Sequence, residues 1–192
     1  MTRGTPQGGI LSPLVWNIVF DSLLERLTEV PGIKPMGYAD DGMFLVTGIC
    51  PQTLLDLAQP VIDMAVAWGQ DNGLVFSCKK TQVILFTRRY NVKMRGNLHI
   101  QGSMIPFSDE VNYLGITLNK RLNWNTHVIN KIKKCKGKLC LLRSALGVKW
   151  GPSPKMALWA FESLMVPSLT YGALVWGQST LNASALKKWA TK

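Results

Sequence analysis

Two adjacent aspartates, Asp40 and Asp41, stand out in a chain that has few acidic residues. They lie in the segment GYADDGM, residues 37–43, and apolar residues follow directly after it. Adjacent carboxylates repel each other, and burying them without a partner is costly. A divalent cation would relieve that repulsion, because Mg²⁺ prefers hard oxygen ligands such as carboxylates. The alternative is a solvated acidic turn, and the pair by itself does not decide between the two.

The charge of the whole chain is strongly basic. Its 192 residues include 22 lysines and arginines against 11 aspartates and glutamates, for a net charge of +11. This balance favours an anionic partner, with nucleic acid as the leading candidate. The four cysteines have no CxxC spacing and there are two histidines, so no zinc site is apparent. Free thiols are typical of an intracellular protein. The most apolar stretch, residues 156–176, is interrupted by polar residues and proline, so we expect no membrane span.

The elements that would position the aspartates follow from the apolar pattern. Ser12 is a candidate N-cap for a helix that runs towards residue 30. A short strand pair is expected over residues 37–46, with the two aspartates at or near its turn. A second helix is expected over residues 53–68. Residues 75–86 read as a strand, and residues 98–118 read as short strands joined by turns.

From residue 123 the pattern changes to that of a basic helix with one apolar seam. The seam residues recur at spacings of three and four: Val128, Ile132, Cys135, Leu139, Leu142 and Leu146. Six basic residues cover the other faces: Lys131, Lys133, Lys134, Lys136, Lys138 and Arg143. A further helix is expected over residues 155–166. The predicted fold class is therefore α+β, with a mixed region over residues 1–120 and a helical region over residues 121–192.

The order of the motifs resembles that of one family. The stretches GTPQGGILSPLVWN, YADD, GLVFSCKKTQVILF and VNYLGITLNKRLNWNTHV together resemble the reverse transcriptases of non-LTR (LINE-like) retrotransposons. Group II intron reverse transcriptases share the first two motifs, whereas YLGITLNKRLNW and the tryptophan-rich tail favour the LINE-like group. The resemblance implies an RNA-directed DNA polymerase whose partners are an RNA template, a DNA primer and deoxynucleoside triphosphates. It implies that residues 1–120 are the C-terminal half of the polymerase palm, an antiparallel sheet with helices, and that residues 121–192 are a truncated, helical thumb.

The resemblance also implies roles for individual residues. Asp40 would be the main metal ligand and Asp41 would assist it, in phosphoryl transfer that uses two Mg²⁺ ions or, alternatively, Mn²⁺. Lys80 would lie near the leaving pyrophosphate. Leu114 and Gly115 would grip the primer backbone, and the six basic residues of the helix would contact phosphates. Nucleotide, template and primer end would meet the opening loop and the residues before the aspartates: Pro6, Gln7, Gly8, Gly9, Tyr38 and Ala39.

Three of these roles have plainer alternatives. The opening loop resembles any helix entry, a strand lysine such as Lys80 more often faces solvent, and a basic helix is often only a solvated face. The family palm carries a further metal-binding aspartate on a strand before the opening loop, and the chain begins at that loop. We therefore expect no polymerisation by the 192 residues alone. A non-catalytic nucleic-acid-binding module and a degraded retroelement product are the alternatives. An intracellular protein, in the nucleus or in a cytoplasmic ribonucleoprotein, is expected.

Overall fold

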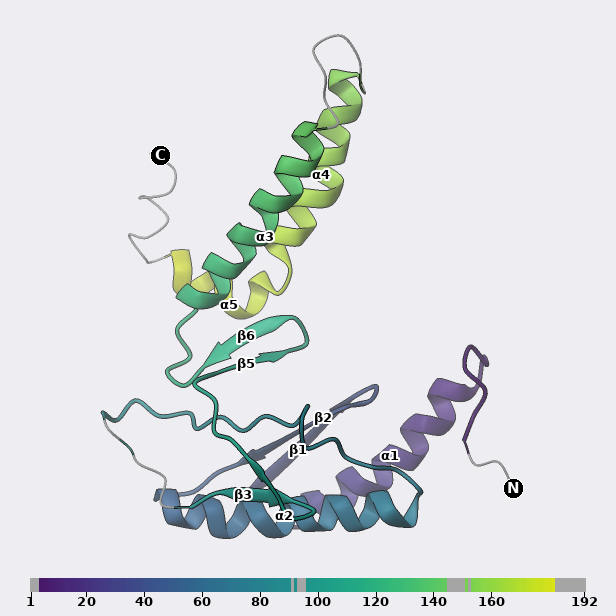
Figure 1. The fold of residues 1–192 in the computed structure, drawn as a ribbon, viewed down its shortest axis with the longest axis vertical. Coiled ribbons are helices and arrows are strands. Elements are labelled where there is room, and N and C mark those ends of the chain that lie inside the picture. The colour runs from purple at the N-terminus through teal and green to yellow at the C-terminus, as the bar shows by residue number, and fades with distance from the viewer. Residues whose placement is uncertain (1–3, 91, 93–95, 145–150, 152, 182–192) are drawn as a thin grey trace. The chain divides into compact units, whose positions relative to one another are not determined.

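The structure, a computed structural model, describes residues 4–90, 92, 96–144, 151 and 153–181. This part of the chain is α+β, as expected, and contains three two-stranded antiparallel sheets and five helices (Figure 1). The chain divides into two compact units: residues 1–83 with 89–108, and residues 84–88 with 109–192. The expected division into a palm and a thumb after residue 120 stays a prediction.

The first unit is built from two long helices and two hairpins. The predicted strand pair around the aspartates is confirmed, and the second helix extends beyond its expected bounds at both ends. Proline at the first helical position explains the earlier start, because its missing N–H has no helical partner there. The elements are α1 (Ser12–Thr28), β1 (Ile33–Tyr38), β2 (Asp41–Val46), α2 (Pro51–Asp71), β3 (Leu98–Ile100) and β4 (Ser103–Ile105).

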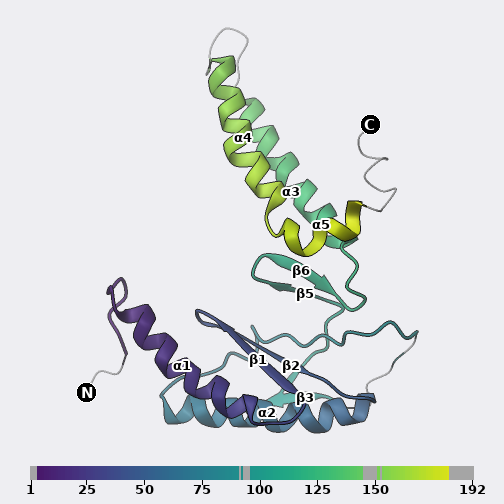
Figure 2. The ribbon, with the colours of Figure 1, turned by 180° about the vertical axis from the view of Figure 1, so that it is seen from behind.

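The core of this unit lies where α1 and α2 pack on the first hairpin (Figure 2). Its buried residues come from both helices and from β1: Phe20, Leu23, Leu27, Ile33, Val61, Ala65 and Trp68. Burying each of the larger apolar side chains contributes about 1.5–3 kcal/mol. A second cluster joins Leu55 of α2 to the β3–β4 hairpin. The opposite face of α1 leaves Leu14, Val15 and Ile18 exposed.

The second unit is a hairpin followed by helices. Its elements are β5 (Glu110–Tyr113), β6 (Ile116–Asn119), α3 (Asn125–Ser144), α4 (Pro154–Thr170) and α5 (Ala173–Leu181). The short strands expected over residues 98–118 are thus confirmed as β3 to β6. Helices α3 and α4 pack along each other (Figure 1). Helix α4 is longer than expected, because Ser153 caps it and the helix continues through Pro167. Helix α5 was not expected.

The apolar seam of α3 is only partly buried. Cys135 is buried, Val128, Ile132 and Leu142 are half-buried, and Leu139 is exposed. The expected seam residue Leu146 lies outside the described residues, as do residues 182–192 of the expected thumb. None of the described helices combines the length and the apolar character needed to cross a membrane.

Two local expectations are wrong. The N-cap of α1 is Leu11, and Ser12 is the first helical residue; its hydroxyl donates to the Pro6 carbonyl at 2.8 Å instead of capping the helix. Residues 75–86 form no strand. A strand needs a neighbouring strand that pairs with its backbone N–H and C=O groups along its length. Within the described residues the segment has one bridge, in which Val83 pairs with Phe107.

Candidate functional site

The two aspartates lie at a tight turn between β1 and β2. In the register of this hairpin Gly37 faces Gly42 and Tyr38 faces Asp41, which leaves Ala39 and Asp40 as the turn residues. Tyr38 and all four residues after it are exposed. Ala39 has a φ of 53°, a left-handed conformation that costs a residue with a Cβ about 1–2 kcal/mol. The turn must therefore be held by contacts made elsewhere.

The glycines of the hairpin allow α1 to approach closely. A Cβ at Gly37 would overlap the Phe20 ring, and one at Gly42 would lie 3.4 Å from it. Phe20 stacks on Trp16 with ring centroids 5.6 Å apart and meets Trp68 edge-on at 6.1 Å. The aromatic ring over the glycine pair thus fixes how the hairpin sits on α1.

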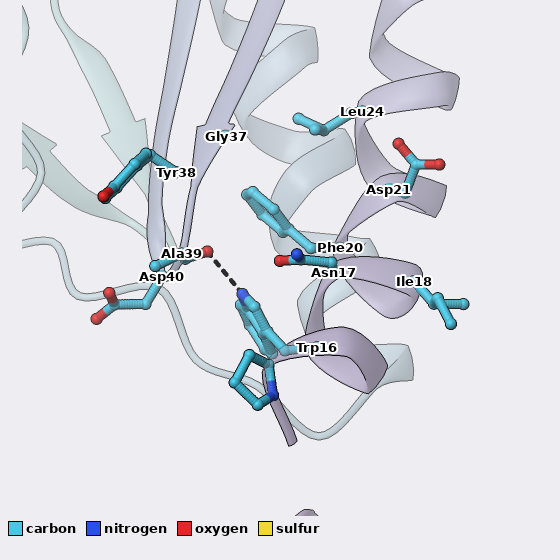
Figure 3. A pocket seen from close by; sticks show the side chains of 11 residues that line it. Trp16, Asn17, Ile18, Phe20, Asp21, Leu24, Gly37, Tyr38, Ala39 and Asp40 are labelled. Atoms are coloured by element: carbon cyan, nitrogen blue, oxygen red, sulfur yellow. Dashed lines mark hydrogen bonds between the residues drawn. The ribbon is translucent and has the colours of Figure 1, made fainter. Parts of the chain in front are cut away.

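Trp16 reaches the turn itself. Its indole Nε1–H donates to the Ala39 carbonyl at 2.6 Å, drawn as the dashed line in Figure 3. An open groove of about 810 Å³ lies between α1 and the hairpin, and its lining includes Trp16, Tyr38, Ala39 and Asp40. The structure therefore brings together three residues that the sequence predicted and one, Trp16, that it did not.

The carboxylates at the turn fit part of a divalent-metal site. Both belong to exposed residues, and the one ion pair found in the described part of the chain involves neither of them. Their oxygens are the hard ligands that Mg²⁺ takes. Asp21 also lines the groove, but its side chain points away from Asp40 (Figure 3). No group of three or more metal-ligating side chains occurs among the described residues, so the pair would need further oxygen ligands.

The opening loop is a tight turn that leads into α1. Gly9 N–H donates to the Pro6 carbonyl at 3.1 Å, and Gly8 has a φ of 84°. A Cβ at Gly9 would lie 2.6 Å from the Ser12 hydroxyl oxygen and 3.2 Å from the Pro6 carbonyl oxygen, so a side chain there would displace the Ser12 hydroxyl. The conformation of this loop, in which Gln7 is exposed, is therefore determined by contacts among its own residues.

Lys80 lies on a turn and not on the strand expected for it. The N–H groups of Lys80 and Thr81 both donate to the Ser77 carbonyl, at 3.1 and 3.0 Å. Lys80 is exposed and does not line the groove at the aspartate turn. Its approach to pyrophosphate stays a prediction.

A second tight turn, between β5 and β6, contains Leu114 and Gly115. Both are left-handed, with φ values of 47° and 76°. Tyr171, at the C-terminal end of α4, donates its hydroxyl to the Leu114 carbonyl at 2.8 Å. Its ring lies 3.2 Å from where a Cβ at Gly115 would be, so glycine makes room for it. Lys131 places its ammonium 4.5 Å from the centre of the same ring.

His127 joins α3 to β6. It is 1% exposed, and its Nδ1 accepts the Thr117 N–H at 3.1 Å. Burial lowers the pKa of His127 from its usual 6.5, and the nearby Lys131 and Lys134 lower it further. Its Nε2 has no hydrogen-bond partner among the residues that the structure describes. The imidazole is therefore a buried hydrogen-bond acceptor that links β6 to α3.

The basic residues of α3 do not share one environment. Lys131 is half-buried on Tyr171, and desolvation followed by the charge of Lys134 lowers its pKa. Lys138 donates to the Ser168 hydroxyl at 3.0 Å. The side chains of Lys133, Lys134, Lys136 and Arg143 are exposed. The six basic residues thus differ in exposure and in partners, and their contact with phosphates stays a prediction.

Sequence reasoning missed Trp16, Tyr171 and His127. Trp16 and Phe20 are four residues apart on a helix, a spacing that places two aromatic rings on one face. A partly buried indole or phenol usually finds a hydrogen-bond partner, which is a usable signal. The partner residues, however, lie 23 and 57 positions away, so the sequence does not name them.

Comparison with known proteins identifies a family and several relatives. Residues 1–118 match the family described as reverse transcriptase (RNA-dependent DNA polymerase). The chain is 29% identical, over its whole length, to a putative 115 kDa protein in type-1 retrotransposable element R1DM of Drosophila melanogaster, of which it covers 18%. It is 28% identical over 92% of its length to a Retrovirus-related Pol polyprotein from type-1 retrotransposable element R1 of Bradysia coprophila, covering 17% of that protein.

A third relative is shorter. The chain is 29% identical over 90% of its length to an R1 Pol polyprotein of Nasonia vitripennis and covers 52% of it. The chain thus spans between about a sixth and a half of the length of these relatives, all from non-LTR elements, which confirms the resemblance drawn from the motifs. No solved structure matches the chain. Because the family match covers the aspartate hairpin, the opening loop and both units up to β6, the chain belongs to the reverse transcriptase (RNA-dependent DNA polymerase) family.

Proposed function

We propose that this chain works as the C-terminal part of a reverse transcriptase domain, with the β1–β2 hairpin in the polymerase palm and α3 and α4 in the thumb. The observation that carries the proposal is the Asp40–Asp41 pair. It lies at an exposed two-residue turn, held by a helix that begins at the opening loop. The family match over residues 1–118 supports the same assignment.

Asp40 and Asp41 would hold a divalent metal ion, Mg²⁺ or alternatively Mn²⁺. When bound, such ions neutralise charge on the reacting phosphates and stabilise the attacking and leaving oxygens. Asp40 is the main ligand in this proposal, and Asp41, the first residue of β2, orients it. Tyr38 and Ala39 line the groove beside the turn and would contact the primer end.

The remaining residues would position the substrates. Pro6, Gln7 and Gly8 are exposed and Gly9 is half-buried, and this loop would contact the template and the incoming deoxynucleoside triphosphate. Lys80 would meet the leaving pyrophosphate, and the Leu114–Gly115 turn would grip the primer backbone. The exposed lysines of α3 would contact phosphates of the RNA template and DNA primer. The proposed setting is intracellular, in the nucleus or a cytoplasmic ribonucleoprotein.

The test is RNA-templated primer extension by a chimera in which this chain replaces the matching segment of the Drosophila R1DM relative. Asp40→Asn removes one negative ligand oxygen at nearly constant volume, so extension with Mg²⁺ should fall to background. Asp56→Asn is the matched control, because Asp56 is an exposed aspartate of α2 whose carboxylate accepts a hydrogen bond from Gln52 and does not line the groove. The control should keep the activity of the unsubstituted chimera.

Undiminished extension by the Asp40→Asn chimera would overturn the metal role of the turn. The 192-residue chain alone is the second arm. It should give no extension with Mg²⁺ or Mn²⁺, because two carboxylates alone hold metal ions poorly and positioning of the substrates is incomplete. Extension by the isolated chain that is lost in Asp40→Asn would show that the pair suffices.

A further inference from the structure

The peptide between Ala39 and Asp40 decides where the Asp40 carboxylate goes. The Ala39 carbonyl and the Asp40 N–H belong to the same planar unit, so holding that carbonyl restricts ψ of Ala39 and φ of Asp40 together. Ala39 adopts its φ of 53° without being glycine. A turn with this cost has competing conformations in which the peptide plane rotates and the Asp40 side chain moves with it.

One side chain contacts that carbonyl. The Trp16 indole N–H donates to it at 2.6 Å, a short distance for an N–H···O hydrogen bond. In Figure 3 the indole approaches the turn from α1 while the Asp40 carboxylate points to the other side of the backbone. The donor therefore holds the peptide without competing with the carboxylate for a ligand.

Trp16 is itself fixed. Its ring stacks on Phe20 with an interplanar angle of 14°, and Phe20 packs against Trp68 in the core. Trp68 in turn donates its indole N–H to the Ser22 hydroxyl at 2.9 Å. This aromatic series connects the rigid core of the unit to the exposed turn, so the position of the donor does not depend on the turn that it contacts.

We propose that Trp16 is a positioning residue for the aspartate turn: its indole N–H holds the Ala39–Asp40 peptide in the orientation that presents the Asp40 carboxylate to a cation. The part concerning the cation rests on the function proposed above. The part concerning the turn does not, because it follows from the hydrogen bond and the left-handed residue alone.

The experiment uses the ¹⁵N-labelled 192-residue chain and two readouts. Amide hydrogen exchange at Ala39, Asp40 and Asp41 reports on the turn without metal, and selective line broadening of the same amides by added Mn²⁺ reports on cation binding. Trp16→Phe keeps an aromatic ring for Phe20 and removes the donor. Replacing Trp16 by benzothienylalanine, in which sulfur stands for the N–H, removes the donor at almost constant shape. Trp159→Phe, at an indole that is 68% exposed on α4, is the control.

Loss of one net hydrogen bond predicts turn amides that exchange about two- to twelvefold faster and Mn²⁺ binding that weakens by at most the same factor. Both Trp16 variants should show this, and exchange in the buried part of α2 should stay unchanged. Turn exchange equal to that of the Trp159→Phe control would overturn the proposal. So would faster exchange spread evenly over α1 and α2, because Trp16 would then support packing only.

The two proposals fail in different ways. If Mn²⁺ does not broaden Asp40 and Asp41 in the unsubstituted chain, the metal role of the pair is lost. Faster turn exchange in both Trp16 variants would still establish the role of the indole in holding the turn.

Discussion

Two tight turns in the molecule use the same device. At the β1–β2 turn Ala39 is left-handed, and Trp16 donates to its carbonyl at 2.6 Å. At the β5–β6 turn Leu114 is left-handed, and Tyr171 donates to its carbonyl at 2.8 Å. In both cases an aromatic side chain, on a helix or at the end of one, donates a hydrogen bond to the carbonyl of the residue with the strained backbone.

The turns differ in what surrounds the donor. The first presents two aspartates, and its donor belongs to an aromatic series that reaches the core. The second contains a left-handed glycine, Gly115, and the Lys131 ammonium lies over the ring of its donor. The two turns therefore hold a carbonyl in the same way but differ in the sign of the charge beside it. The acidic turn suits a cation, whereas the basic neighbourhood of the other suits a phosphate backbone.

The charge difference gives the largest expected effect. If about four basic residues of α3 contact phosphates, the affinity of the chain for an RNA–DNA hybrid should fall about 50- to 150-fold between 50 and 200 mM salt. Reversing Lys133 and Lys134 to glutamate should weaken binding and flatten this dependence. The same change in net charge at Lys34 and Lys79 of the first unit is the control. Fluorescence anisotropy measures both, and equal effects of the two pairs would remove α3 as the contact surface.

The packing of the first hairpin gives the next effect. Gly37→Ala places a Cβ on the buried Phe20 ring, which cannot move away because Trp16 and Trp68 flank it. We expect the first unit to lose about 2 kcal/mol of stability, measured by hydrogen exchange of its core amides. Gly137→Ala is the opposite control: nothing lies within 4 Å of its Cβ, and α3 should gain about 0.5–1 kcal/mol. A neutral Gly37→Ala would contradict the close approach of α1.

Removing the donor at the second turn has a smaller effect. Tyr171→Phe should destabilise the β5–β6 turn by about 0.5–1 kcal/mol, because the Leu114 carbonyl loses one hydrogen bond near solvent. Tyr171→Leu removes the ring under Lys131 as well and should cost about 0.5–1 kcal/mol more. Hydrogen exchange of Leu114 and Gly115 measures both. Equal results for the two variants would show that the ring contact with Lys131 contributes nothing.

The smallest effect concerns pH. Burial, with Lys131 and Lys134 nearby, lowers the pKa of His127 in the folded chain below 6.5. The unfolded chain therefore takes up the proton first, so the stability of the second unit should be full above pH 6.5 and decline as the pH falls from there towards the folded pKa. Urea unfolding of the second unit at pH 7.5 and 6.0 measures this. His127→Gln should remove the decline, and a stability that rises on acidification would contradict it.

Local patterns predicted much of this fold. The strand pair around Asp40 and the short strands of residues 98–118 were predicted correctly, because a hairpin is set by neighbours in sequence. Residues 75–86 have strand composition but form no strand, since pairing depends on a partner that composition does not show. Trp16 and Tyr171 escaped prediction for the same reason. Their acceptors are distant carbonyls, and a carbonyl has no sequence signature.

The glycine pair beneath Phe20 also limits how the hairpin can vary in length. Side chains alternate between the two faces of a strand, so one residue inserted between Gly37 and Gly42 would shift the register next to the turn. Gly37 and Gly42 would no longer oppose each other, and a side chain would take the place of a glycine against the ring. The spacing from the opening loop to the aspartates can therefore change by loop insertions between α1 and β1, but the number of residues from Gly37 to Gly42 cannot.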